Sequence, residues 1–212
     1  MPTHHVPSDA LLAYAAGTSA PGEELLVACH LTTCPSCRSA VQHAEAWCAE
    51  RAFGAPTDPP AEVPRSLWER LEEPEPAPAA PPSAPDRVVP APLARWIGGF
   101  GGLGWRRVAP GLRALRVPLP GIDQTVFLLD LEPGRTLPAH GHTGPERVLV
   151  LRGGFAVDGD AFVAGDVSWR EDDHGVVTVD DDAPCTSLFV TDGPLRFGLG
   201  PLDTWMNRWL VR

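Results

Sequence analysis

Apolar residues in the first 53 positions recur at helical spacing, and the interruptions between them are glycine, proline and small polar residues. Ser8 and Asp9 suit the N-terminus of a short first helix, and two acidic residues suit the first turn of a second. A third helix is predicted to begin near Pro35, because proline is tolerated in the first turn, and to end at Gly54. The expected helices cover residues 8–16, 19–30 and 35–53.

The next segment carries a fourth amphipathic helix and then a change in composition. Residues 64–73 read PRSLWERLEE, in which Leu67, Trp68 and Leu71 share one helical face. Residues 74–92 are dominated by proline and alanine, and such a stretch cannot form a ladder of backbone hydrogen bonds. We expect an extended, semi-rigid linker there.

Beyond the linker, short β-like runs are separated by glycine, proline and aspartate, a pattern typical of an all-β sandwich or barrel. The predicted fold class is therefore α+β in two domains, a small helical bundle followed by an all-β barrel. The predicted boundaries are residues 1–73 for the bundle, 74–92 for the linker and 93–212 for the barrel. Because the linker separates them, each domain is expected to fold on its own.

The chain is acidic, with a net charge of −10 and an isoelectric point near 5.1, and its basic side chains other than histidine are all arginines. Nucleic acids call for a basic surface, so we expect no direct contact with them and a basic protein partner instead. No signal peptide and no apolar run of the roughly 20 residues that a membrane span needs is evident, so we expect no membrane association and a cytoplasmic location. Thiols stay reduced there, which favours metal binding over a disulfide for closely spaced cysteines.

The stretch CHLTTCPSC contains the spacing H-x3-C-x2-C at His30, Cys34 and Cys37. A structural zinc ion takes four Cys or His ligands in a tetrahedron, and a C-x2-C pair lets two sulfurs converge around a helix start. We expect these three residues to bind zinc, with His4 or His5 as the fourth ligand. A thioredoxin-like redox role is disfavoured because no βαβ pattern surrounds the pair. The alternative is two free thiols beside a surface histidine.

Residues 134–153 fit the pattern G-x5-H-x-H-x3-E-x6-G, the first motif of the cupin barrels. Two histidines at i and i+2 on a strand project into a barrel interior, and a glutamate at the next strand start can turn in beside them. A histidine after a later strand is the expected fourth ligand, although the second cupin motif is degenerate. Such a site accepts zinc or another divalent transition metal, and the alternative is a barrel that has lost its metal. The predicted ligands are His140, His142, Glu146 and His174.

The opening HHVPSDALLAYAAGT, the ACHLTTCPSC corner and the cupin motif together resemble the zinc-binding anti-sigma factors of the ChrR type. The resemblance covers nearly the whole chain and is weakest in the linker. It implies that the N-terminal domain binds an extracytoplasmic-function (ECF) sigma factor in a 1:1 heterodimer. The resemblance also implies that the barrel metal is zinc and that the barrel senses oxidative or photo-oxidative stress. It further implies that His5 rather than His4 is the fourth N-terminal ligand. The apolar face of Leu67, Trp68 and Leu71 would then be a helix-in-groove anchor for the sigma factor.

Two other functions fit the same motifs. A cupin metalloenzyme of the dioxygenase or isomerase type, with an accessory zinc domain, would need an open metal position beside a pocket with an inward Arg, Gln or Tyr. The chain has one tyrosine, Tyr14, and it lies outside the barrel. A sensor that binds a small organic acid at the barrel metal is the third possibility. All three predict metal but only the first predicts a tight sigma partner, and we expect a regulator without catalytic residues.

Overall fold

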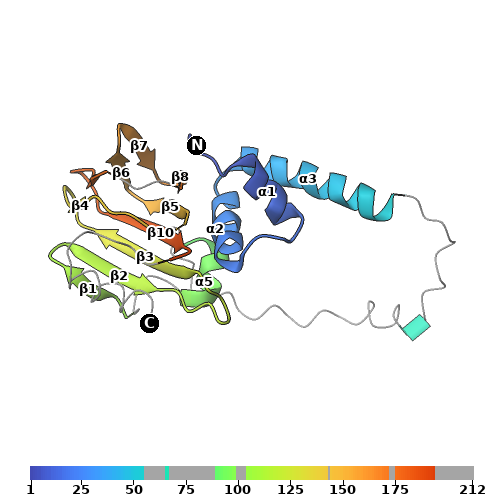
Figure 1. Ribbon diagram of the computed structural model, residues 1–212, viewed down its shortest axis with the longest axis horizontal. Coiled ribbons are helices and arrows are strands. Elements are labelled where there is room, and N and C mark those ends of the chain that lie inside the picture. The colour runs from blue at the N-terminus through green and yellow to red at the C-terminus, as the bar shows by residue number, and fades with distance from the viewer. Residues whose placement is uncertain (55–64, 67–88, 99–103, 143, 172–174, 194–212) are drawn as a thin grey trace.

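The computed structural model describes residues 1–54, 65–66, 89–98, 104–142, 144–171 and 175–193. Helices form the N-terminal part, and strands follow from residue 106 onward (Figure 1). The first three helices lie where the hydrophobic pattern predicts them. The described helices are α1 (Ser8–Ala15), α2 (Pro21–Leu31), α3 (Pro35–Phe53) and α5 (Ala91–Ile97).

The ends of these helices follow from local chemistry. Proline occupies the first turn of α2, α3 and α5, where its missing N–H costs no helical hydrogen bond. Glu23 and Glu24 lie in the first turn of α2 and complement the helix dipole. The expected side-chain cap of α1 is not formed, because Ser8 is already helical and Pro7 precedes it. The Pro7 carbonyl accepts the first helical bond, from the Leu11 N–H, so the fixed φ of proline starts this helix instead.

The described strands form two antiparallel sheets, called the barrel below. The larger sheet has the order β1-β2-β3-β10-β5-β8, and the smaller has the order β4-β9-β6-β7. This all-β unit after a set of helices confirms the predicted α+β fold class. The strands are β1 (Arg106–Ala109), β2 (Leu112–Arg116), β3 (Thr125–Leu131), β4 (Thr136–Leu137), β5 (Glu146–Arg152), β6 (Gly154–Val157), β7 (Asp160–Val163), β8 (Val167–Arg170), β9 (Val177–Val179) and β10 (Cys185–Thr191).

The central strands of the larger sheet are buried on both faces, and their successive residues alternate between two apolar clusters. The inner cluster lies between the two sheets and includes Phe127 of β3 and Phe189 of β10, whose rings stack 5.1 Å apart. The outer cluster joins Leu128 and Leu188 of the same strands to the helices, including Leu26 of α2. β3 and β10 are consequently buried along their whole length. Helices and barrel thus share one apolar core, which the composition of the proline-rich stretch does not predict.

Polar contacts complete the interface between α2 and the barrel. Arg147 of β5 is buried and forms an ion pair with Glu23 of α2. A second ion pair joins Arg147 to Asp192, 3.1 Å away. The Gly22 N–H at the start of α2 donates to the Gln124 side chain at 2.8 Å. Because a buried arginine needs partners, the first turn of α2 is fixed in position over the sheet.

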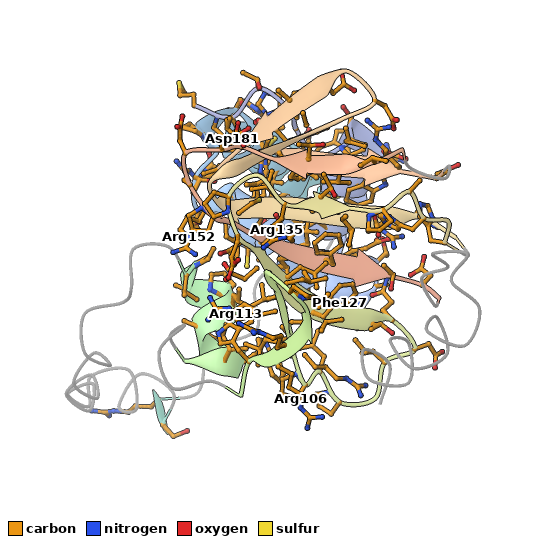
Figure 2. All side chains as sticks on the ribbon, turned by 90° about the vertical axis from the view of Figure 1, so that its left-hand side faces the viewer. Arg106, Arg113, Phe127, Arg135, Arg152 and Asp181 are labelled. Carbon is orange, nitrogen blue, oxygen red and sulfur yellow. The ribbon has the colours of Figure 1, made fainter. Side chains whose placement is uncertain are left out.

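A buried carboxylate ties four strands of the larger sheet together. Asp130 of β3 accepts hydrogen bonds from Thr186 of β10 at 2.7 Å and from Arg152 of β5 at 3.0 Å. It also pairs with Arg113 of β2. Figure 2 labels the two arginines, which lie on the same side of the view. These charge-assisted bonds hold the register of the sheet that separates the two apolar clusters.

Several predicted features fall outside the described residues. They are most of the linker, the anchor residues Leu67, Trp68 and Leu71, and the barrel ligand His174. Helix α5 begins at Ala91, just before the expected end of the linker. In the described part of the chain, no helix combines the length and apolar character required to cross a membrane.

The packing of α2 on the sheet predicts the effect of Gly22→Ala. A methyl group there would meet the Gln124 side chain at 2.7 Å and Val190 at 2.8 Å, closer than van der Waals contact. Alanine favours a helix by up to about 1 kcal/mol, but overpacking costs about 1–3 kcal/mol, so we expect a net loss of stability. Urea unfolding of the full chain measures this change. The control is Gly104→Ala, where nothing lies within 4 Å of the added Cβ, and equal stability of the two variants would contradict the described packing.

Candidate metal centres

The structure brings the four predicted N-terminal ligands together. One donor atom each from His5, His30, Cys34 and Cys37 lies within 4.8 Å of the others. His30 belongs to the last turn of α2, and the two cysteines lie at the corner between α2 and α3. His5 comes from the N-terminal arm, residues 1–7, which precedes α1. Two imidazoles and two thiols are a donor set of structural zinc sites.

His30 is fully buried and oriented by the barrel. Its Nδ1 lies 2.9 Å from the Gly165 carbonyl, which only accepts hydrogen bonds, so Nδ1 carries the proton and Nε2 keeps its lone pair. Among the described residues this Nε2 has no hydrogen-bond partner. Burial lowers the pKa of His30 and so favours the neutral imidazole that metals bind. A buried lone pair left open near two thiols fits a metal ion.

The two cysteines differ in how readily they ionise. The Cys34 sulfur caps α3 by accepting from the Cys37 N–H at 3.5 Å, and it lies 3.1 Å from the Ser36 hydroxyl. Burial raises the pKa of Cys34, but these hydrogen bonds outweigh burial and lower it to about 7. Burial and the adjacent Cys34 raise the pKa of Cys37 to about 11. A bound dication would displace the remaining proton and make both sulfurs ligands.

The two N-terminal histidines point to different partners. The Nδ1 of His5 lies 3.3 Å from the Cys34 sulfur and 3.5 Å from the Cys37 sulfur. The Nδ1 of His4 lies 3.4 Å from the carboxylate of Asp166, a barrel residue. His5 is therefore the histidine that joins the cluster, and His4 is held by the barrel.

The second candidate centre lies where β4 leads into β5. The Nε2 of His140 and the Oε1 of Glu146 are 3.5 Å apart, and both side chains are buried. The Nδ1 of His140 donates to the Pro138 carbonyl at 3.0 Å, and the Nδ1 of His142 donates to the Gly144 carbonyl. These bonds fix the tautomer, so that in both rings Nε2 carries the lone pair available to a metal. The described residues thus bring His140 and Glu146 together, and the place of His174 lies outside them.

A small cavity opens beside this pair in the barrel interior. Its volume is about 30 Å³, and the described residues that line it are mostly apolar, with His140, Glu146 and two serines as polar exceptions. Pockets for organic ligands usually measure about 300–1,000 Å³. A cavity of this size has room for an ion and one or two waters, which disfavours an organic substrate at this position.

Sequence reasoning missed the role of three residues that support these centres. Gly165 and Asp166 hold His30 and His4, and Arg147 joins the barrel to α2. The sequence identifies Gly165 and Asp166 as the retained positions of the degenerate second cupin motif, and that motif does not predict their contacts with the N-terminal arm and His30. An arginine inside an apolar run at β5 is one signal that could have indicated a covered outer face.

The cluster predicts different effects for two cysteine substitutions. Cys37→Ser should remove about one equivalent of zinc per chain, because it deletes a ligand, and should loosen the helices, because structural zinc contributes folding energy. Cys48→Ser is the control, since Cys48 lies farther along α3 and outside the cluster. Metal analysis of the purified full chains distinguishes the two. Equal zinc content in both variants would exclude the N-terminal site.

Comparison with known proteins agrees with both parts of the chain. A family model described as the ChrR cupin-like domain matches residues 99–196. The chain is 37% identical over 208 residues to the anti-sigma-E factor ChrR of Cereibacter sphaeroides, with 92% of each chain covered. The crystal structure of Rhodobacter sphaeroides SigE in complex with the anti-sigma ChrR matches with a TM-score of 0.74 and 31% identity, covering 91% of this chain and 100% of the other. This likeness extends along both the helices and the barrel, and the protein therefore belongs to the ChrR family of anti-sigma factors.

Proposed function

We propose that this protein is an anti-sigma factor that holds a sigma factor inactive through its N-terminal helices and carries the barrel as a regulatory domain. The observation that carries the proposal is the 37% identity, over 92% of both chains, to a protein named as an anti-sigma-E factor. The partner is proposed to be an ECF sigma factor bound 1:1. Because sigma factors act on RNA polymerase, the expected location is the cytoplasm.

The N-terminal centre is proposed to hold zinc, and the barrel centre zinc or another divalent transition metal. A His2Cys2 cluster with a buried open lone pair at His30 supports the first. The paired His140 and Glu146, with both imidazoles oriented by backbone carbonyls, support the second. A metal at the N-terminal centre would join the arm to the α2–α3 corner and so stabilise the helices that meet the sigma factor.

The surface proposed to bind the sigma factor includes the outer part of α3. This helix extends away from the sheets (Figure 1), and beyond Val41 none of its residues is buried. Trp47 is 54% exposed and Phe53 is 81% exposed, so this end of α3 offers two large apolar side chains to a partner. The anchor residues Leu67, Trp68 and Leu71 remain part of this proposal. The first 50 residues carry five acidic side chains against one arginine, which suits a basic, DNA-binding partner.

The barrel is proposed to respond to oxidative or photo-oxidative stress. Its strand β5 carries Glu146 toward the interior and Arg147 toward α2, so neighbouring residues serve the candidate metal centre and the helix contact. A change in the metal coordination of Glu146 can therefore shift the neighbouring Arg147, whose side chain forms the ion pair with Glu23 of α2. The cavity of about 30 Å³ supports this regulatory role over the enzyme alternative.

Co-expression of the full chain with an ECF sigma factor tests the proposal. We expect a 1:1 complex that survives purification and prevents the sigma factor from binding RNA polymerase core enzyme. Measured mass by light scattering gives the stoichiometry. A chain that folds and binds metal but leaves several such sigma factors free would contradict the proposal.

The exposed tryptophans give a matched pair of variants. Trp47→Ala should weaken sigma binding by about 10- to 30-fold, since truncation of a central aromatic anchor costs on the order of 2 kcal/mol. Trp96→Ala removes a tryptophan that is 44% exposed on α5, beside the barrel, and should leave binding unchanged. Titration calorimetry with the purified sigma factor measures both. Equal affinities would place the binding surface elsewhere than on α3.

A substitution at a barrel ligand should change how fast the sigma factor is released under oxidant without changing how tightly it is bound beforehand. Glu146→Gln should leave the affinity for the sigma factor near that of the wild type, because Glu146 lies inside the barrel, but should change the rate of release under oxidant. A coupling of about 1–3 kcal/mol would alter occupancy several-fold or more. Release is followed on the purified complex, with metal measured before and after oxidant. Identical release from wild type and variant would show that the barrel centre is not the sensor.

A further inference from the structure

The turn that joins β7 to β8 reaches from the barrel to the N-terminal metal centre. It contains Gly165 and Asp166, which belong to neither of the sets of residues assigned above as ligands. Gly165 contacts the proposed ligand His30 directly. Asp166 contacts Thr3 and His4, the two residues before the proposed ligand His5.

Asp166 fixes the N-terminal arm. Its carboxylate is completely buried and accepts hydrogen bonds from the Thr3 N–H at 2.6 Å, the His4 N–H at 3.0 Å and the Val163 N–H at 2.9 Å. Burial opposes the ionised form, but these bonds outweigh it and hold the pKa of Asp166 below its ordinary value. Two of these donors belong to Thr3 and His4, the residues just before His5. The carboxylate therefore fixes the position of the His5 backbone and, through it, the position of the His5 ring.

Gly165 fixes the second imidazole. Its carbonyl accepts from the His30 Nδ1 at 2.9 Å, and its own φ is +98°. A Cβ at this position would meet Pro2 of the arm at 2.9 Å. The turn therefore needs glycine both for its backbone conformation and for the close approach of the arm.

The same arm also extends the hydrogen bonding of the barrel. The Val167 N–H, at the start of β8, donates to the His4 carbonyl at 3.2 Å. β8 pairs with β5 in a register that sets Glu146 opposite Arg170. The paired strands β5 and β8 therefore connect the candidate barrel centre, at Glu146, with the arm that carries His5, at Val167.

We propose that the Gly165–Asp166 turn of the barrel is the outer shell of the N-terminal metal centre, with Asp166 as a positioning residue, and that it is the contact through which barrel and helical metal site affect one another. The inference rests on the proposed function only in that it takes zinc as the N-terminal metal. Outer-shell partners orient ligands, and their loss commonly lowers metal affinity 10- to 100-fold. Because coupling free energies are reciprocal, zinc at the N-terminal centre must also stabilise the turn.

The first test compares Asp166→Asn with Asp182→Asn in the full chain. Asp182 is an exposed carboxylate in the turn before β10, so the same chemical change is made without touching the arm. Zinc affinity is measured by competition with a chromophoric chelator, and the N-terminal equivalent is identified as the one lost in Cys37→Ser. We expect 10- to 100-fold weaker zinc binding for Asp166→Asn and no change for Asp182→Asn. Wild-type affinity in a folded Asp166→Asn chain would overturn the inference.

The second test does not depend on how well Asp166→Asn folds. Hydrogen exchange is followed in wild type and in Cys37→Ser, which lacks an N-terminal ligand but keeps every predicted ligand of the barrel. We expect faster exchange at the Val163, Gly165 and Val167 amides in Cys37→Ser, with the amides of β9, which belongs to the smaller sheet and packs in the inner cluster, unchanged as internal reference. Equal exchange would overturn the inference. Loss of zinc in Cys37→Ser, together with wild-type zinc affinity in Asp166→Asn and unchanged exchange of the turn amides in Cys37→Ser, contradicts this inference alone. Failure to bind a sigma factor contradicts only the proposed function.

Discussion

A buried carboxylate must find hydrogen-bond donors, and in this fold Asp166 finds them in the first residues of the chain. That requirement brings the N-terminal arm across the β7–β8 turn and sets His5 beside Cys34 and Cys37. The hydrogen bond from His30 to Gly165 depends on the same turn. The helical cluster is thus arranged by groups on the barrel, although every one of its four donor side chains lies within the first 37 residues.

The larger sheet explains how one unit can serve both parts of the molecule. In a strand, neighbouring side chains point to opposite faces, so β5 supplies Glu146 to the interior and Arg147 to the helices. The same alternation divides Phe127 from Leu128 between the inner and outer clusters. A sheet covered on both sides leaves little room for one face to change without the other, because packed interiors are dense and transmit strain.

The local features were predictable from the sequence, and the long-range ones were not. Pro35 and Gly54 bound a helix by their own backbone chemistry, and the fixed spacing of two histidines and a glutamate indicates a strand pair with an inward face. The choice between His4 and His5 depends on a carboxylate more than 160 positions away, which no local pattern reveals. The shared core was hidden by the proline-rich stretch, yet the run of α2 from Leu25 to Val27 carries three adjacent buried residues, more than a helix with one covered face requires.

The order of synthesis gives the β7–β8 turn a further meaning. The ligands of the helical cluster leave the ribosome early, whereas Gly165 and Asp166 follow roughly 130 residues later, a delay on the order of 10 s at cellular translation rates. During that interval His30 and the N-terminal arm lack the hydrogen bonds that the turn supplies. If the turn orients the ligands as proposed, the centre reaches its full metal affinity only after the β7–β8 turn has emerged, although all four ligands are made within the first 37 residues.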